Sequence, residues 1–344
     1  IQINGAELRG CKIKYSSSSK GFGIFSSNDS PHDGIHMVVP LDLAITPMRV
    51  LEDPLVGPEC RSMFEEGDVD DRLLIMLFLT VQRLRKSSSW KPYLDMLPNE
   101  FGNPLWFTAD ELSELKGTSL LRATELQKEN LKSLFDDKVK KIVEKLLDID
   151  GVCESNGVRF EDFLWANSVF WSRALTIPFP RSYVIRQPRQ TEGSSSSTET
   201  GDSSSDPPDE EETIWIEGLV PGIDFCNHDS KALATWEVDA TGSTTGIPFS
   251  MCLVSVGDSF VGEEEEEEEK EICINYGNKG NEELLYLYGF VLEENPDDTL
   301  MVKKPITIIH PHPLCHDNLF RILQIHYPNT CLQCLLLKSS LESG

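Results

Sequence analysis

The sequence predicts an α+β fold in which a β-rich core is interrupted by a mainly helical segment. Residues 1–45 and 218–292 contain short apolar runs that stop at turn-forming residues, which is typical of buried strands. From about Arg49 to Arg186, apolar residues recur every three or four positions, as they do on amphipathic helices. The core is therefore expected to form from two parts that lie far apart in the sequence.

The strands of the first part are expected at Cys11–Tyr15, within Lys20–Phe25, and at His36–Val39, where Pro40 ends the run. Gly21 and Gly23 flank Phe22, and two glycines so placed allow the backbone to approach a ligand closely. Taken alone, this pair favours a tight hairpin without a ligand. The second part contains the predicted strands Phe249–Val256 and Glu271–Tyr276.

Four helical stretches are predicted between the two parts: 71–86, 108–117, 120–147 and 159–175. The first opens with aspartates and closes on basic residues, as the helix dipole favours. The second begins with a capping box, Thr108 followed by Glu111. The fourth is rich in aromatic residues that are expected to pack in a core, and 89–98 reads as a turn-rich connection.

The formal net charge of −26 is concentrated in two runs. Residues 192–213 carry eight acids and no base, and 263–269 are seven consecutive glutamates. Segments so poor in apolar residues cannot offset the entropy of ordering, so 187–213 and 263–269 are predicted to be disordered, solvated loops. An acidic docking role is the alternative reading. A sequence this acidic shows no basic patch of the kind that nucleic-acid-binding proteins use, and its acidic runs would repel anionic lipid.

The longest apolar run, Leu73–Leu79, is far shorter than the roughly 20 residues that span a bilayer, so no membrane segment is predicted. Nine cysteines, an odd number scattered along the chain, favour a reducing compartment over a disulfide framework. The sequence opens on Ile1 instead of methionine, which indicates a fragment or a processed form.

Two further features of the sequence bear on metal binding and catalysis. A zinc site could be drawn near the end of the sequence, but a single Cys-x-x-Cys lacks the two well-spaced ligand pairs of tetrahedral zinc, so no metal is predicted. The candidate ligands are His310, His312, Cys315, His316, Cys331 and Cys334. The common phosphate-binding, dehydrogenase and hydrolase motifs are also absent from the sequence.

Several further residues carry little information one by one, but the order in which they occur along the chain is characteristic of a family. Asn227–His228 alone reads as a capped turn, Tyr276 as a strand-end tyrosine and Tyr288 as a core tyrosine. Together with several other motifs they resemble the SET domain, and most closely its branch of Rubisco large-subunit lysine methyltransferases. The resemblance rests on Lys20-Gly-Phe-Gly-Ile24, 89–98, 112–121, Trp171-Ser-Arg-Ala174, Val220–His228, Asn275-Tyr276 and Asn281–Phe290.

The resemblance implies S-adenosylmethionine as cofactor, a lysine-bearing protein as substrate, and a role for each matched residue. Lys20, Gly21, Phe22 and Gly23 would present main-chain groups to the cofactor, Arg173 would bind its carboxylate, and Asn227 and His228 would hydrogen-bond it. Tyr276 matches the catalytic-site tyrosine that orients the target amine. Asp224, Trp236 and Tyr288 match positions on the substrate side, although the match of Trp236 is loose because the preceding loop is shorter.

The resemblance also fixes the expected organisation. Residues 10–45 and 218–292 would form the SET core, 46–217 a helical insert, and 293–344 the remnant of a truncated C-terminal substrate-binding lobe. Three departures from the family stand out: Asp229 after His228, Gly277 after Tyr276, and no second arginine after Arg173.

The expected function is methyl transfer from S-adenosylmethionine to a lysine of a non-histone protein by a monomer. Such transfer needs positioning and a neutral amine more than acid–base groups, which suits tyrosines and an asparagine. Two alternatives stay open: histidine methylation on the same fold, and a non-catalytic SET-like scaffold. The expected compartment is the plastid if the source is a plant, with cytoplasm or nucleus as alternatives.

Overall fold

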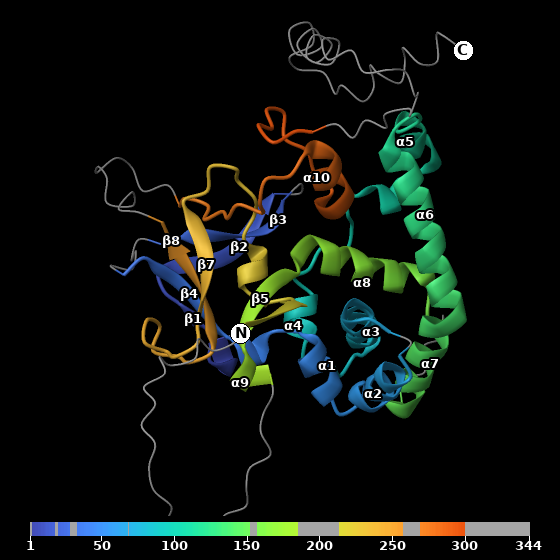
Figure 1. Cartoon of the computed structure of the whole chain (residues 1–344), viewed down its shortest axis with the longest axis horizontal. Coiled ribbons are helices and arrows are strands. Elements are labelled where there is room, and N and C mark those ends of the chain that lie inside the picture. Colours follow the sequence, from blue (N-terminus) through green and yellow to red (C-terminus); the bar gives the residue numbers. More distant parts are fainter. Residues whose placement is uncertain are drawn as a thin grey trace, which may run out of the picture. The chain divides into compact units, whose positions relative to one another are not determined.

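The computed structural model describes residues 2–17, 20–27, 33–67, 69–151, 157–184, 213–256 and 269–299. It divides into two compact units, each made of two stretches of chain (Figure 1). Unit 1 comprises 1–78 and 173–274, and unit 2 comprises 79–172 and 275–344. Strands lie in unit 1 and most helices in unit 2, so the predicted mixture of α and β structure is confirmed.

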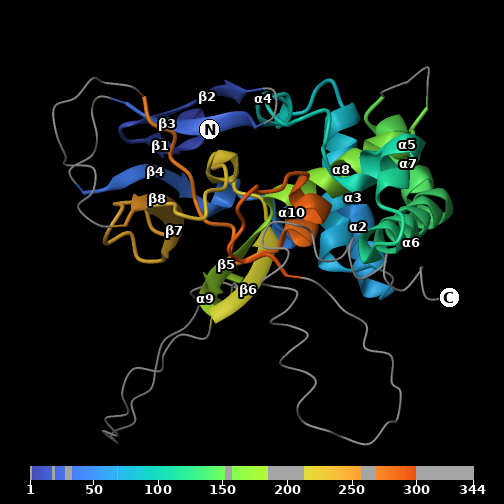
Figure 2. The same cartoon turned by 90° about the horizontal axis from the view of Figure 1, so that it is seen from above.

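Unit 1 is built around a four-stranded antiparallel sheet in the order β1-β4-β8-β7, whose neighbouring strands can be followed in Figures 1 and 2. Its central strands β4 and β8 are almost wholly buried and rich in β-branched and apolar residues, which explains why they form the core of the sheet. The strands are β1 (Glu7–Leu8), β4 (Ile35–Pro40), β7 (Ala234–Asp239) and β8 (Ser250–Ser255).

Two hairpin sheets complete the strands of unit 1. The predicted hairpin is confirmed as β2 (Cys11–Ser17) paired with β3 (Gly21–Ser26), and Lys14 lies opposite Gly23. The second sheet pairs β5 (Leu175–Pro180) with β6 (Thr213–Gly218) and was not predicted. Two prolines in β5 explain why the sequence did not predict this sheet. Proline lacks the backbone N–H that a strand donates to its neighbour, so it argues against a strand.

The remaining elements of unit 1 are short. They are η1 (Gln2–Asn4), η2 (Leu41–Leu43), α1 (Pro47–Glu52), α2 (Gly57–Glu65), α9 (Arg181–Val184) and η5 (Ile223–Phe225), and α3 (Asp71–Leu84) continues from unit 1 into unit 2. The predicted strand 271–276 is not a regular strand. Single bridges join Glu271 to Phe25 and Ile274 to His228 and Ala234 instead.

Unit 2 is helical. The capping box of Thr108 and Glu111 is confirmed at the start of α5, and the predicted long helix 120–147 is broken into α6 and α7 by a π-helical turn, η4. Its elements are α4 (Lys91–Leu94), η3 (Pro104–Trp106), α5 (Ala109–Glu114), α6 (Ser119–Leu134), η4 (Phe135–Val139), α7 (Lys140–Ile149), α8 (Phe160–Arg173, whose last residue belongs to unit 1) and α10 (Asn281–Tyr288).

Helix α8 forms the core of unit 2, as its aromatic residues predicted. Phe163, Trp165 and Phe170 are fully buried, and the ring centroid of Phe163 lies 6.3 Å from that of Phe135. The indole Nε1 of Trp165 donates to the Pro98 carbonyl at 2.8 Å. The buried indole is therefore satisfied, and the apolar surface of α8 serves packing.

Several predictions fall outside the described residues. These are the loop 187–212, the glutamates 263–268, and residues 300–344 of the expected C-terminal lobe, which include the histidines and cysteines considered for zinc. Among the helices that the structure does describe, none has the length and apolar character required to cross a membrane.

The turn between β7 and β8 is organised by one buried carboxylate. Asp239 accepts hydrogen bonds from the backbone N–H groups of Gly242, Thr244 and Thr245 and from the Thr245 hydroxyl, at 2.8–3.0 Å. Burial alone would raise the pKa of this carboxyl, but the hydrogen bonds from Thr245, Thr244 and Gly242 outweigh it and bring the pKa down to about 2.

We expect Asp239→Asn to lower the free energy of unfolding by about 1–2 kcal/mol at neutral pH, because the amide cannot accept all four hydrogen bonds. The wild-type contribution is present above about pH 4 and is lost as the pH falls through about 2, since the folded-state pKa lies below the unfolded one. Urea titrations across this range should therefore show a shallower acid dependence in the variant. Glu237→Gln, at an exposed position of β7, is the control and should change little.

Candidate functional site

A short extended segment, residues 270–274, connects the two parts of the predicted site in unit 1. On one side it follows β3: the Ser26 N–H donates to the Lys270 carbonyl at 2.8 Å, and the Ile272 N–H to the Ile24 carbonyl at 2.7 Å. On the other side, the Ile274 N–H donates to the Asn227 carbonyl at 3.0 Å. The segment thus holds the Asn227 turn beside β3.

This pairing brings Asn227 to the Gly-Phe-Gly stretch, 205 residues away in sequence. The Asn227 amide Nδ2 donates weakly to the Phe22 carbonyl at 3.4 Å and strongly to Oε1 of Glu271 at 2.6 Å. The Phe22 ring packs edge-on against Phe225, with centroids 6.1 Å apart. The predicted residues Phe22, Gly23 and Asn227 therefore lie together.

Glu271 is a residue of this site that the sequence analysis did not single out. Its Oε2 accepts from Lys20 Nζ at 3.0 Å, and its hydrogen bond is the main reason that the pKa of Lys20 is raised. Glu271 is easily overlooked in the sequence because it follows a run of glutamates. Alternation was the available signal, because period two in Glu-Ile-Cys-Ile-Asn places Glu271, Cys273 and Asn275 on the face opposite the isoleucines.

Arg173 and Asp224 form a second, buried group in unit 1. Arg173 Nη1 donates to the Asp224 main-chain carbonyl at 2.7 Å and lies 3.9 Å from the Asp224 carboxylate, whose side chain is 0% exposed. The guanidinium also stacks over the Phe225 ring, 5.2 Å from its centroid. Arg173 Nε is buried and has no hydrogen-bond partner among the described residues.

His228 and Trp236 complete the predicted residues of unit 1. Burial lowers the pKa of His228, so the ring is neutral at physiological pH, and its backbone forms a parallel bridge with Ile274. Trp236 lies on the edge strand β7, opposite Leu253 of β8. The structure thus places Trp236 in the sheet.

In unit 2, the two predicted tyrosines meet in an aromatic cluster. The ring centroids of Tyr276 and Tyr288 are 4.9 Å apart, and Phe290 lies 6.5 Å from Tyr276 and 6.1 Å from Tyr288. Burial is the main cause that raises the pKa of Tyr288, so its hydroxyl stays protonated and can donate a hydrogen bond. Phe290 ends the motif Asn281–Phe290 but had been given no role from the sequence; the aromatic spacing in Tyr288-Gly-Phe was its signal.

Gly289, between two members of this cluster, is required by its surroundings. It caps α10 in the left-handed conformation, with φ of 82°. A Cβ there would lie 2.7 Å from the backbone of Gly102 and Asn103, and a Cβ on Gly102 would lie 2.3 Å from the Gly289 carbonyl. This backbone contact, possible only between glycines, fixes where the segment carrying Tyr288 and Phe290 leaves the helix.

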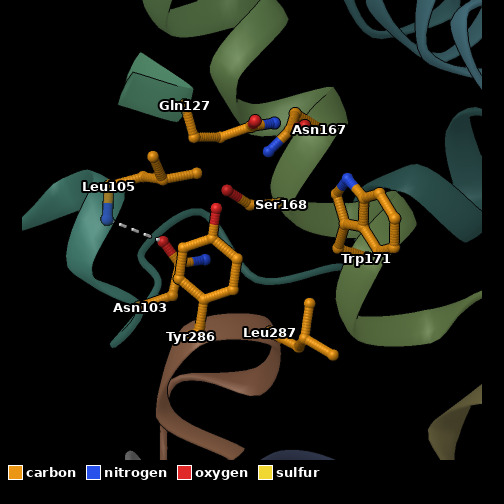
Figure 3. A pocket seen from close by; sticks show the side chains of 8 residues that line it. All are labelled: Asn103, Leu105, Gln127, Asn167, Ser168, Trp171, Tyr286 and Leu287. Carbon is orange, nitrogen blue, oxygen red and sulfur yellow. Dashed lines mark hydrogen bonds between the residues drawn. The ribbon is translucent and has the colours of Figure 1, made fainter. Parts of the chain in front are cut away.

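A small pocket of about 100 Å³ in unit 2 is lined by Tyr286 and Leu287 of α10 and by residues of α8 (Figure 3). The hydroxyl groups of Tyr286 and Ser168 and the amide of Asn167 face it, and Asn167 Oδ1 is buried with no hydrogen-bond partner among the described residues. Its lining is uncharged and mostly apolar apart from these few polar groups. The other lining residues are Asn103, Leu105, Gln127, Trp171 and Leu287, so none of the predicted site residues contributes to it.

Within the described ranges, no three or more histidine, cysteine, aspartate or glutamate side chains are grouped as metal ligands. The histidines and cysteines considered as zinc ligands from the sequence lie outside those ranges.

No family model matches the chain, but individual proteins do. It is 30% identical over 157 residues to the [fructose-bisphosphate aldolase]-lysine N-methyltransferase of Arabidopsis thaliana, which is 46% of this chain and 30% of that protein. It is 27% identical over 176 residues to the Rubisco large-subunit N-methyltransferase of Pisum sativum, covering 51% of this chain and 34% of that protein. Both relatives are named as chloroplastic.

A third relative is the actin-histidine N-methyltransferase of Canis lupus familiaris, 23% identical over 303 residues, or 87% of this chain and 43% of that protein. The matches thus span less than half the length of these curated relatives. Among solved structures, the SET domain of LSMT bound to lysine and AdoHcy matches with a TM-score of 0.59 and 22% identity, covering 85% of this chain and 55% of that one. The chain has a SET-domain fold. The resemblance drawn from the SET-domain motifs is therefore confirmed.

We expect Gly289→Ala to destabilise the protein by about 2–4 kcal/mol, because left-handed strain adds to a clash with backbone atoms that cannot move aside. Gly277→Ala is the matched control: its φ is 99°, but a Cβ there meets nothing within 4 Å, so only about 1 kcal/mol of strain is expected. Denaturant unfolding measures both. Equal losses would show that the contact with Gly102 does not constrain the turn.

Proposed function

We propose that this SET domain is a protein-lysine N-methyltransferase that uses S-adenosylmethionine. The observation that carries the proposal is the contact between Asn227 and Phe22, because it joins the two motifs to which the resemblance assigns cofactor binding. The names of the plant relatives, which are lysine methyltransferases, support the same activity.

The residues of unit 1 fit this cofactor. A carboxylate ligand would supply an acceptor for the buried Nε of Arg173, which has none among the described residues. Phe22 and the residues beside it would offer main-chain groups, and Asn227 and His228 would add side-chain and main-chain hydrogen bonds. S-adenosylmethionine supplies a methyl group activated by a sulfonium. Asp224, buried beside Arg173, would orient the guanidinium, whereas a direct contact with substrate remains the prediction of the resemblance.

The residues of unit 2 suit the target amine. Attack on a methyl group requires a neutral amine, and an aromatic environment disfavours the charged ammonium. The Tyr276 hydroxyl would orient the amine by a hydrogen bond, while the rings of Tyr288 and Phe290 would exclude water and accommodate the methylated product by cation–π attraction. This cluster positions the reactants and does not transfer a proton itself.

The proposal extends to the arrangement of the chain's segments and to the cellular compartment of the protein. We assign the helical residues within 46–217 to the family's insert and Trp236 to the edge of the substrate side. A monomer acting on a non-histone protein fits the resemblance, and the chloroplastic names of two relatives favour a plastid over cytoplasm or nucleus.

We expect Tyr276→Phe to reduce kcat on the order of 100-fold with little change in cofactor affinity, because the amine loses its orienting hydroxyl. Asn227→Ala should weaken cofactor binding about tenfold. Incorporation of labelled methyl groups from S-adenosylmethionine into a plant lysate measures the activity, and calorimetry measures the affinity. If the three proteins label the lysate equally, the assignment of these two residues is wrong.

The labelled product also identifies the acceptor. Acid hydrolysis and amino-acid analysis should yield methyllysine, because the plant relatives are named as lysine enzymes. Methylhistidine would establish the second candidate function, which the similarity to actin-histidine N-methyltransferase supports. A protein that binds no cofactor at millimolar concentration would instead be a SET-like scaffold.

The assignment of Arg173 has its own test. Arg173→Lys keeps a cation beside Asp224 but loses the planar fork, so affinity for S-adenosylhomocysteine should fall about tenfold. Affinity for the decarboxylated analogue of that ligand should be low in both proteins and differ little between them. A similar loss for both ligands would mean that Arg173 does not bind the carboxylate.

A further inference from the structure

Glu271 is held in place by the backbone on both of its sides. The preceding carbonyl, of Lys270, accepts from the Ser26 N–H, and the following N–H, of Ile272, donates to the Ile24 carbonyl. Glu271 itself forms the bridge with Phe25. The main chain is therefore fixed beside β3 at Glu271 itself and at the residues on both of its sides.

The carboxylate occupies the space above Gly23. A Cβ on Gly23 would lie 2.5 Å from Glu271 Oε1 and 3.0 Å from Asn227 Nδ2, so glycine at this position makes room for the carboxylate and its amide partner. The Glu271 side chain is only 16% exposed, compared with 50% for Lys20. The carboxylate of Glu271 is therefore less exposed to solvent than the ammonium group of Lys20.

Both partners of Glu271 are residues to which the resemblance assigns cofactor binding. Oε1 accepts from Asn227 Nδ2 at 2.6 Å, and Oε2 accepts from Lys20 Nζ at 3.0 Å. The first contact engages the NH₂ end of the Asn227 amide and leaves Oδ1 as its acceptor. The second compensates the positive charge of Lys20 beside the glycines.

We propose that Glu271 positions Asn227 for the cofactor and sets the charge of this site so that it favours a cationic sulfonium over a neutral thioether. The inference rests on the proposed function and deepens it. S-adenosylmethionine and S-adenosylhomocysteine differ by one methyl group and one positive charge. The ratio of their affinities therefore reports the local charge, and a site that favours the sulfonium releases the product more readily.

Two substitutions should move this ratio in opposite directions. Glu271→Gln keeps an acceptor for Asn227 but leaves Lys20 uncompensated, so the preference for the cationic ligand should fall on the order of fivefold at low ionic strength. Lys20→Met leaves Glu271 uncompensated, and the preference should rise by a similar factor. In the double variant the ratio should return close to that of the wild type.

Isothermal titration calorimetry on the full chain measures these ratios with three ligands: S-adenosylmethionine, sinefungin as a cationic analogue that transfers no methyl group, and S-adenosylhomocysteine. Glu271→Ala adds the positioning test, because it also releases the Asn227 amide and should weaken even the neutral ligand about tenfold. Each ratio is taken within one preparation, so a partly misfolded variant still reports it.

The outcomes separate clearly. A ratio that shifts down in Glu271→Gln and up in Lys20→Met supports the proposal. Equal loss of affinity for all three ligands in Glu271→Gln, or ratios unchanged in both single variants, overturns it and leaves Glu271 with a structural role only. Wild-type protein that binds none of the three ligands contradicts the proposed function itself, which is a different result.

Discussion

The pairing of residues 270–274 with two partners is the interaction on which the candidate cofactor site depends. Hydrogen bonds to Ile24 and Ser26 attach this segment to β3, and hydrogen bonds between Ile274 and the 227–229 turn attach the turn to the segment. Neither the Gly-Phe-Gly stretch nor Asn227 reaches the other through local structure, since 205 residues separate Phe22 and Asn227. The same segment continues along the chain into Asn275 and Tyr276, the tyrosine proposed to orient the target amine.

Three glycines leave space that the candidate site and the aromatic cluster need. At Gly23 the absent Cβ leaves space for the Glu271 carboxylate, and at Gly102 and Gly289 it allows two backbones to touch. The first arrangement places a charge among residues proposed to bind the cofactor, and the second fixes the turn between Tyr288 and Phe290. At Gly102 and Gly289 a methyl group would meet backbone atoms, which cannot move aside, whereas at Gly23 it would push away the ends of the Glu271 and Asn227 side chains and so disrupt their contact.

Much of this could be predicted from the sequence because the signals were local. The β2–β3 hairpin, β4, β8 and the capping box of α5 each follow from alternation, burial or a known cap. The β5–β6 pair could not, because Pro178 and Pro180 oppose strand formation and only pairing with β6 overrides them. The motifs indicated the candidate site residues but not Glu271, whose contacts depend on a neighbour 44 residues away and on the space above Gly23.

The surroundings of the Arg173 side chain favour the binding of a ligand. Its guanidinium is largely buried, one amine donates to the Asp224 carbonyl, and the Asp224 carboxylate is 3.9 Å away. Nε nevertheless has no hydrogen-bond partner among the described residues, and a buried donor left unsatisfied costs about 1–3 kcal/mol. Asp224 does not remove this cost: its Oδ1 accepts from the Gly222 N–H, its Oδ2 lies 3.9 Å from Nη1, and Nε has no acceptor among the described residues. An external carboxylate would satisfy the donor, so the same arrangement that weakens the free protein would strengthen the binding of an amino-acid cofactor.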